Sequence, residues 1–299
     1  MKTTHLVLVL VFAGKSLACD ICGGVHANSS IGLFAANRFH TLGLSTQYRS
    51  YQSFDNGQLH SKEVFLFNSL QLRYQLGSQI QLYGQLPYQM GWQYLEEEKS
   101  LKTGFGDAQG FINLIGLQQQ DSSGITQKFI SVALGVKAPT GQYVSPSNLQ
   151  QNLYPGTGAW NYTLLLNGFK LLNKKWSLQS EMSHTWKGKN NYAFQYGNSS
   201  QLAALLVLNE KFQSYRFLGS LGFQVDHFAA NHWDWQALAP EARHEGTLLQ
   251  TKMSCNLLTY NWLYSLQAIM PIWQNINSGT LKFRPQIQFT IQYLIQQKK

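Results

Sequence analysis

Hydrophobic and polar residues alternate along most of the chain after Arg38. In the clearest segment, residues 80–94, the even positions carry Leu82, Leu86 and Trp92, whereas the odd positions carry mainly glutamine. Because side chains alternate between the two faces of a β-strand, this pattern predicts strands with one apolar and one amide face. Twelve such strands are predicted, with ten or fourteen as alternatives, near residues 39–48, 64–76, 79–94, 108–117, 127–137, 160–170, 175–186, 201–208, 215–225, 247–257, 261–272 and 282–294.

The connections between these segments alternate between long and short. The long ones are residues 49–63, 95–107, 138–159, 187–200, 226–246 and 273–281, and the short ones are residues 77–78, 118–126, 171–174, 209–214 and 258–260. Outer-membrane barrels have short periplasmic turns and longer loops outside. We therefore predict an all-β fold, a transmembrane antiparallel up-and-down β-barrel of about 12 strands, with both of its ends in the periplasm.

Composition supports this architecture. Charged residues make up 12% of the 299 residues, against roughly 25% in an ordinary soluble domain. The 44% of hydrophobic residues excludes a disordered chain, and no apolar run after residue 14 approaches the roughly 18 residues of a spanning helix. A soluble β-sandwich is disfavoured, because the polar faces carry amides rather than charges and the apolar faces often end in Trp or Tyr. The net charge of +9 comes without a basic run, so no nucleic-acid partner is expected.

The first residues predict export. A short basic start precedes the apolar run Leu6–Gly14, and Ser16-Leu17-Ala18 places small residues where a signal peptidase reads them. We expect a signal peptide over residues 1–18 and a location in the outer membrane of a Gram-negative bacterium. Residues 19–38 then form a periplasmic segment or a plug in the lumen, which the apolar stretch Ile31–Phe34 favours. The barrel is expected over residues 39–294, followed by a short tail, 295–299.

Five motifs carry a resemblance to a known family. They are Cys19–Gly23, Leu82–Tyr88, Gly104–Asp107, Gly135–Gly141 and Gly156–Gly158, in this order along about half of the chain. With them the chain resembles the outer-membrane barrel family named for the meta-pathway of phenol degradation, in particular its Bacteroidetes-type members. The resemblance implies a transport-type barrel, related in kind to channels for hydrophobic and aromatic compounds.

The end of the chain departs from a common barrel pattern. Many outer-membrane barrels end on an aromatic residue, whereas here Tyr293 is followed by residues 294–299. The expected recognition signal for the barrel assembly machinery is therefore slightly internal.

If the apolar faces meet lipid, the amide faces must line the lumen. The predicted lumen residues are Gln71, Arg73, Gln75, Gln81, Tyr83, Gln85, Gln89, Gln179, Glu181, Arg216, Gln224, Gln250, Lys252, Gln267, Lys282, Arg284, Gln286 and Gln288. Neutral amides hydrate a channel without a strong charge preference, and a few opposite charges, such as Glu181 with Arg216 or Arg73, could pair across it. The alternative is an interior filled by a hydrogen-bond network, because a barrel of about twelve strands is narrow.

Three cysteines are present. A disulfide between Cys19 and Cys22 is the default in an oxidising compartment. A metal site with His26 is the alternative, although a closed zinc site needs four ligands; lipidation of Cys19 is a further one. Cys255 is predicted on the lipid face, and no cofactor is expected.

An enzyme is not expected. His184 is the outward histidine within a predicted strand, and the next outward residue on that strand is Trp186, so a nucleophile within its reach is not foreseen. The sequence therefore predicts a barrel that passes small-molecule solutes passively through the outer-membrane lipid. A non-transporting barrel that binds through its loops and the Cys19/Cys22 segment is the alternative, and an outer-membrane hydrolase is a distant third.

Overall fold

The computed structural model describes residues 39–95, 98–123, 125–143, 153–233, 236–237 and 244–296. Its strands are β1 (Phe39–Asp55), β2 (Gln58–Leu76), β3 (Ile80–Leu95), β4 (Glu98–Phe105), β5 (Gln109–Gln120), β6 (Thr126–Lys137), β7 (Asn161–Leu171), β8 (Trp176–Lys187), β9 (Phe194–Gln195), β10 (Ser199–Lys211), β11 (Tyr215–Phe228), β12 (His232–Trp233), β13 (Gln236–Ala237), β14 (Gly246–Thr259), β15 (Trp262–Ile276), β16 (Leu281–Phe283) and β17 (Gln286–Gln296). A short 3-10 helix, η3 (Asn277–Gly279), precedes β16. Within these ranges no helix has the length and apolar character needed to cross a membrane.

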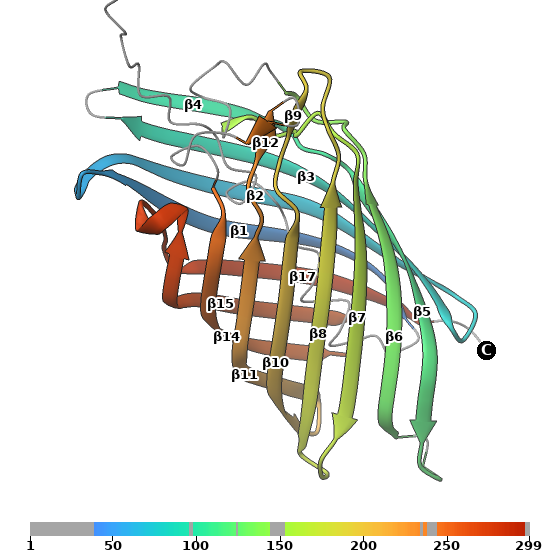
Figure 1. The fold of residues 1–299 in the computed structure, drawn as a ribbon. Coiled ribbons are helices and arrows are strands. Elements are labelled where there is room, and N and C mark those ends of the chain that lie inside the picture. Colours follow the sequence, from blue (N-terminus) through green and yellow to red (C-terminus); the bar gives the residue numbers. More distant parts are fainter. Residues whose placement is uncertain are drawn as a thin grey trace, which may run out of the picture.

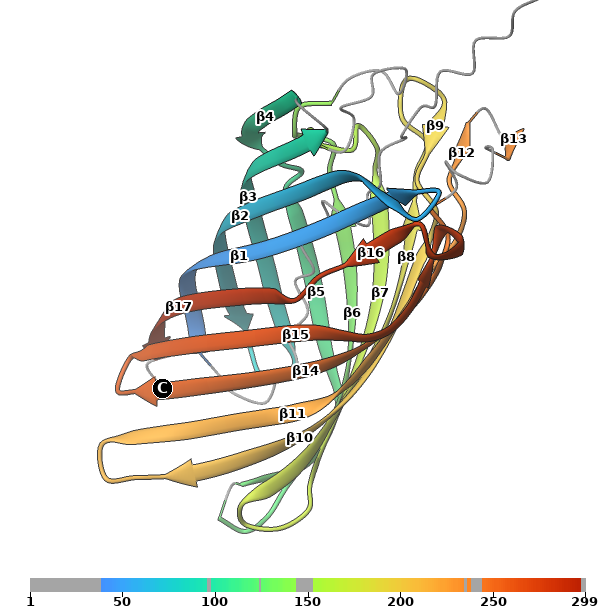
Figure 2. The same cartoon turned by 90° about the vertical axis from the view of Figure 1, so that its left-hand side faces the viewer.

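Fourteen of the described strands form one antiparallel sheet that closes on itself (Figure 1). Closure occurs where β1, the first strand, pairs with β17, the last one, as Figure 2 shows from another side. Both β4 and β5 pair with β3, and both β16 and β17 pair with β1, so each of these couples forms a single passage. The barrel therefore has twelve passages, and the predicted all-β fold is confirmed.

The two ends of the barrel differ in their connections. At the end that we call the short-turn end, tight turns follow β2, β5, β7, β10 and β14, and Phe39 pairs there with Gln296. At the opposite, long-loop end, β1 and β2 form a hairpin around Asn56 and Gly57. Both turn residues have positive φ (48° and 81°), which matches the Asn-Gly preference of the two-residue hairpin turn.

Two predicted long connections are corrected at the long-loop end. Residues 49–63 are mostly strand, because β1 and β2 continue to the Asn56-Gly57 turn. Residues 95–107 contain β4, which extends the pairing along β3. The alternation of apolar and polar residues is less regular at the ends of these strands, but the backbone pairing with the neighbouring strand continues there.

The strand pairing is irregular at several places, and at three of them a bulge lies beside a proline. Residues 106–108 stand opposite only two residues of β3, one of which is Pro87. Residues 284–286 likewise stand opposite two residues of β1, and this bulge contains Pro285. In β15 the pairing shifts beside Pro271. Proline cannot donate a ladder hydrogen bond, so at these three bulges a proline weakens the pairing.

The two faces of the wall have opposite chemistry. Outward side chains are apolar and exposed, as with Leu44 (65%), Phe223 (60%) and Leu134 (59%). Aromatic residues such as Trp186 and Trp262 lie outward near the two ends. Inward side chains are mostly glutamine, asparagine and serine, and they are buried. An apolar outer belt with aromatic ends is typical of a barrel embedded in a membrane.

Candidate functional site: the barrel interior

A ladder of amides runs along the inner wall from β17 to β2. Gln292 Nε2 donates to Gln71 Oε1 (3.3 Å), and Gln71 Nε2 donates to Ser45 Oγ (3.1 Å). Gly43 on β1 stands between the two glutamines in the register, and a Cβ there would lie 2.6 Å from Gln292 Cγ. The missing side chain of Gly43 therefore lets the glutamines meet across β1.

A second ladder continues from β2 to β5. Gln81 Nε2 donates to Gln75 Oε1 (2.8 Å), and Asn113 Nδ2 donates to Gln81 Oε1 (3.0 Å). Nearer the middle of β3, Gln109 Nε2 donates to Gln85 Oε1 (2.7 Å). These bonds join neighbouring strands, so the side chains lie along the wall rather than across the lumen.

Charged groups meet around an internal pocket. Gln224 Nε2 donates to both carboxylate oxygens of Asp226 (3.0 and 2.9 Å), and Gln250 Nε2 also donates to this carboxylate. Lys252 and Arg49 line the same pocket. Its cavity volume of about 30 Å³ is enough for about two water molecules.

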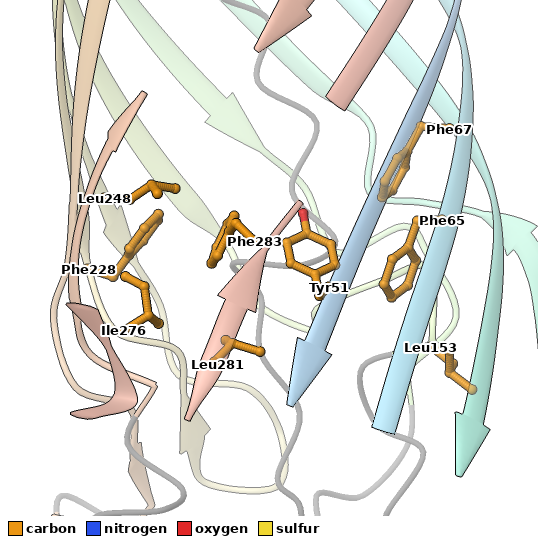
Figure 3. Packing of buried hydrophobic residues seen from close by; sticks show 9 residues of the cluster. All are labelled: Tyr51, Phe65, Phe67, Leu153, Phe228, Leu248, Ile276, Leu281 and Phe283. Atoms are coloured by element: carbon orange, nitrogen blue, oxygen red, sulfur yellow. The ribbon is translucent and has the colours of Figure 1, made fainter. Parts of the chain in front are cut away.

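An apolar layer crosses the interior toward the long-loop end (Figure 3). It contains the aromatic side chains of Tyr51, Phe65, Phe228 and Phe283 from β1, β2, β11 and β16. Tyr51 packs edge-to-face on Phe283 (ring centroids 4.8 Å apart) and on Phe65 (5.8 Å). Leu153, from the connection between β6 and β7, completes the layer beside Phe65.

Most predicted lumen residues lie on the inner face. The buried ones are Gln71, Arg73, Gln75, Gln81, Tyr83, Gln85, Gln89, Gln179, Glu181, Gln224, Gln250, Lys252, Gln267 and Gln286. Gln288 is half-buried and lines the pocket. Arg216 stands at one of the alternate positions of β11 whose side chains point inward, but it lies at the short-turn end and is exposed there. Its Nε donates to Asn209 Oδ1 (2.7 Å).

Two predicted lumen residues are on the outer face instead. Lys282 is exposed with its ammonium 4.7 Å from the centre of the Phe54 ring. Arg284 is exposed and donates to Gln52 Oε1. The bulge at residues 284–286 is the cause, because its extra residue reverses which side chains point inward. Phe283, an apolar residue between Lys282 and Arg284 that the alternation would direct toward lipid, is consequently buried inside the barrel.

Glu181 forms no hydrogen bond with either Arg216 or Arg73 in the described part of the chain. Arg216 is bound to Asn209, as described above. Both carboxylate oxygens of Glu181 are buried without a hydrogen-bond partner in the described part of the chain. The sequence pattern could not exclude this pairing, because it does not give the height of a residue along the barrel.

Several interior residues were not predicted. Arg49 and Glu63 fell in a predicted loop, although the alternation of Gln47, Arg49 and Tyr51 could have placed them on the inner face. Asp226 was placed at the start of a predicted loop and is buried at the pocket. Longer strands at the long-loop end account for all three omissions.

Of the three cysteines, the structure describes Cys255. Cys19, Cys22 and His26 lie outside the described residues. Cys255 is an exposed free thiol on the outer face of β14. We expect mass mapping under non-reducing conditions to find Cys19 linked to Cys22 and Cys255 unlinked. A bridge from Cys255 to either residue would contradict the placement of Cys255 on the outer face.

A hydroxyl group does lie within reach of His184, contrary to the prediction. His184 Nδ1 lies 2.8 Å from Ser200 Oγ, which the neighbouring strand β10 supplies. The prediction considered only hydroxyl groups on the same strand, whereas cross-strand neighbours are closer. A serine–histidine catalytic site also needs a group that orients the base and donors for an oxyanion. Ser200 is the hydrogen-bond partner found for His184 among the described residues.

No model of a known protein family matches the chain, and no curated protein matches it. Among solved structures it is similar to the COG4313 outer membrane channel from Pseudomonas putida F1, with a TM-score of 0.66 and 17% identity over 86% of this chain and 96% of that one. It is also similar to the beta domain of the Bordetella autotransporter BrkA, with a TM-score of 0.52 and 10% identity over 85% and 99% of the two chains. These likenesses establish the fold, a closed antiparallel β-barrel like those of the outer-membrane proteins that it matches. The resemblance to the phenol meta-pathway family stays a prediction.

Proposed function

We propose that the protein is a passive channel of the Gram-negative outer membrane, which small solutes cross through the amide-lined interior. Its exposed apolar belt supports contact with membrane lipid. Its similarity to a solved structure named as an outer membrane channel supports the transport role.

One observation carries the proposal: the inner wall holds buried polar atoms that have no hydrogen-bond partner among the described residues. They belong to Gln85, Asn113, Ser131, Asn167, Gln179, Glu181, Gln224 and Gln250. In a dry interior each such atom would cost about 1–3 kcal/mol. Several together would consume much of the 5–15 kcal/mol or so that stabilises an ordinary protein. A wall of this kind favours a hydrated path, because water in the lumen can satisfy these atoms.

The interior offers a solute two kinds of surface. The pocket lined by Asp226, Lys252 and Arg49 is polar, and the apolar layer lies beside it. Solutes would therefore pass an amide-rich region and an apolar one in turn. Compounds with a polar group and an apolar body match both regions, in keeping with the hydrophobic or aromatic compounds that the family resemblance implies.

We expect the purified full-length protein to produce stable openings in a planar lipid bilayer, because water that satisfies the buried amides would also carry ions through the lumen. Single-channel recording at constant voltage measures this, and a heat-unfolded sample of the same preparation serves as the control. Liposome swelling with uncharged sugars of increasing size gives the size limit. A folded protein that conducts nothing and admits no sugar would refute the channel and favour the non-transporting barrel.

A hydrolase is the weaker alternative. The Ser200–His184 contact provides a nucleophile and a base, but the described residues show neither a carboxylate that orients the imidazole nor an oxyanion site beside them. An acyl-transfer mechanism needs these parts. We therefore do not assign catalysis to this pair.

A further inference from the structure

Asp107 lies in the bulge that separates β4 from β5, and its carboxylate is buried. Oδ1 accepts a hydrogen bond from Gly141 N (3.0 Å). Oδ2 accepts hydrogen bonds from Thr157 N (2.9 Å) and Thr157 Oγ1 (2.6 Å), and Lys137 Nζ is 3.7 Å away. One carboxylate thus binds both described parts of the connection between β6 and β7.

Glycines allow these two parts to touch. A Cβ on Gly141 would lie 2.7 Å from Gly156 Cα, so a larger residue would separate the two backbones. Gly156 N donates to Gln142 O (2.9 Å). A Cβ on Gly106, beside Asp107, would lie 3.0 Å from Pro155 O. The three glycine motifs of the sequence therefore meet at Asp107.

This arrangement fixes the position of Leu153 near the inner wall. It stands four residues before Thr157 and is fully buried inside the barrel. Its carbonyl oxygen accepts a hydrogen bond from Gln89 Nε2 (3.2 Å) on the inner wall. Its Cδ2 is 3.3 Å from the position of a Cβ on Gly91, next to the Phe65 ring. The connection thus inserts an apolar side chain into the lumen at the apolar layer.

We propose that Leu153 narrows the channel and that Asp107 is the positioning residue that keeps it there. This inference rests on the proposed channel function and adds a residue that determines its selectivity. Ordering a connection costs conformational entropy, and the three hydrogen bonds to the Asp107 side chain offset that cost. Without them, Leu153 leaves the lumen and the passage widens.

The test compares single-channel conductance and sugar permeation of the full-length protein and its variants. Leu153→Ala removes the side chain from the lumen, and Asp107→Asn weakens the attachment of the connection. Both should raise the conductance about twofold and admit a larger sugar, since permeation follows pore diameter. Asp121→Asn is the matched control, because Asp121 Oδ1 also accepts two backbone N–H bonds, from Ser123 and Ile125, but in an exposed turn at the short-turn end.

If Asp107 had only a structural role, Asp107→Asn would lower the stability of the protein without changing the largest sugar that permeates. If Asp107 positions Leu153, the double variant Asp107→Asn/Leu153→Ala should conduct like Leu153→Ala alone, because both changes remove the same obstruction. If Asp107→Asn does not fold, Thr157→Val removes one donor to the carboxylate and keeps the side-chain shape. Unchanged conductance and sugar limits in Leu153→Ala, with an active wild type, would overturn this inference alone. A wild type that does not conduct would instead refute the proposed function.

Discussion

Arginine at position 287 is expected to block assembly of the barrel, whereas arginine at position 288 is not. Ile287 is 52% exposed on the outer face of β17, and Gln288 is next to it on the inner face at the pocket. An arginine that faces lipid near the middle of the membrane costs about 2–4 kcal/mol, and a lumen substitution changes mainly selectivity. Ile287→Arg should therefore lose the folded, heat-modifiable band on a gel.

Gln288→Arg should keep that band and shift the channel toward anions, because it adds a fixed positive charge inside the lumen. The reversal potential in a salt gradient measures this shift. The two residues are neighbours in the sequence and lie at nearly the same depth, so each is a control for the other. Equal damage from both substitutions, or the reverse order, would show that the inner and outer faces are misassigned.

Gly222→Ala should destabilise the barrel strongly, while Gly84→Ala should not. A Cβ on Gly222 would overlap the carbonyl oxygen of Ala204 and lie 2.7 Å from Leu205 Cα on the adjacent strand β10. A Cβ on Gly84 would meet nothing within 4 Å. Overpacking of this kind costs about 1–3 kcal/mol or more, because the backbones of β10 and β11 must separate.

Chemical unfolding of the protein in detergent micelles, followed by tryptophan fluorescence, measures both effects. Gly222→Ala should lower the midpoint denaturant concentration. Gly84→Ala should leave it unchanged or raise it slightly, since alanine loses less backbone entropy than glycine on folding. A tolerated Gly222→Ala would mean that β10 and β11 are less closely paired than the structure describes.

Much of the barrel could be predicted from local pattern. The twelve segments and the inward placement of residues such as Gln81 and Gln179 follow from strand alternation, as the burial of these side chains shows. The lipid requires an apolar outer face and the interior accepts amides, so apolar and polar residues alternate along each strand. The fold class was accessible for this reason.

The interior layer was harder to predict. Phe65 and Phe67 point inward from β2, although most inward residues of that strand are polar. Apolar residues on both faces of a strand carry no period, so residues 64–67 gave no sign of which aromatic side chains enter the lumen. Only the tertiary structure brings Tyr51, Phe228 and Phe283 beside them.

Sequence alone predicted the strand segments and the inward face of each uninterrupted strand, because both depend on side chains two residues apart. Only the pairing of the strands settled the number of passages at twelve. The tertiary structure decided the bulge that turns Lys282 and Arg284 outward and Phe283 inward. It also decided the meeting of Asp107 with Gly141 and Thr157, across up to 50 positions of chain. A bulge is an extra residue relative to a neighbouring strand, and a buried carboxylate selects partners by proximity in space. Neither property exists until the strands have paired.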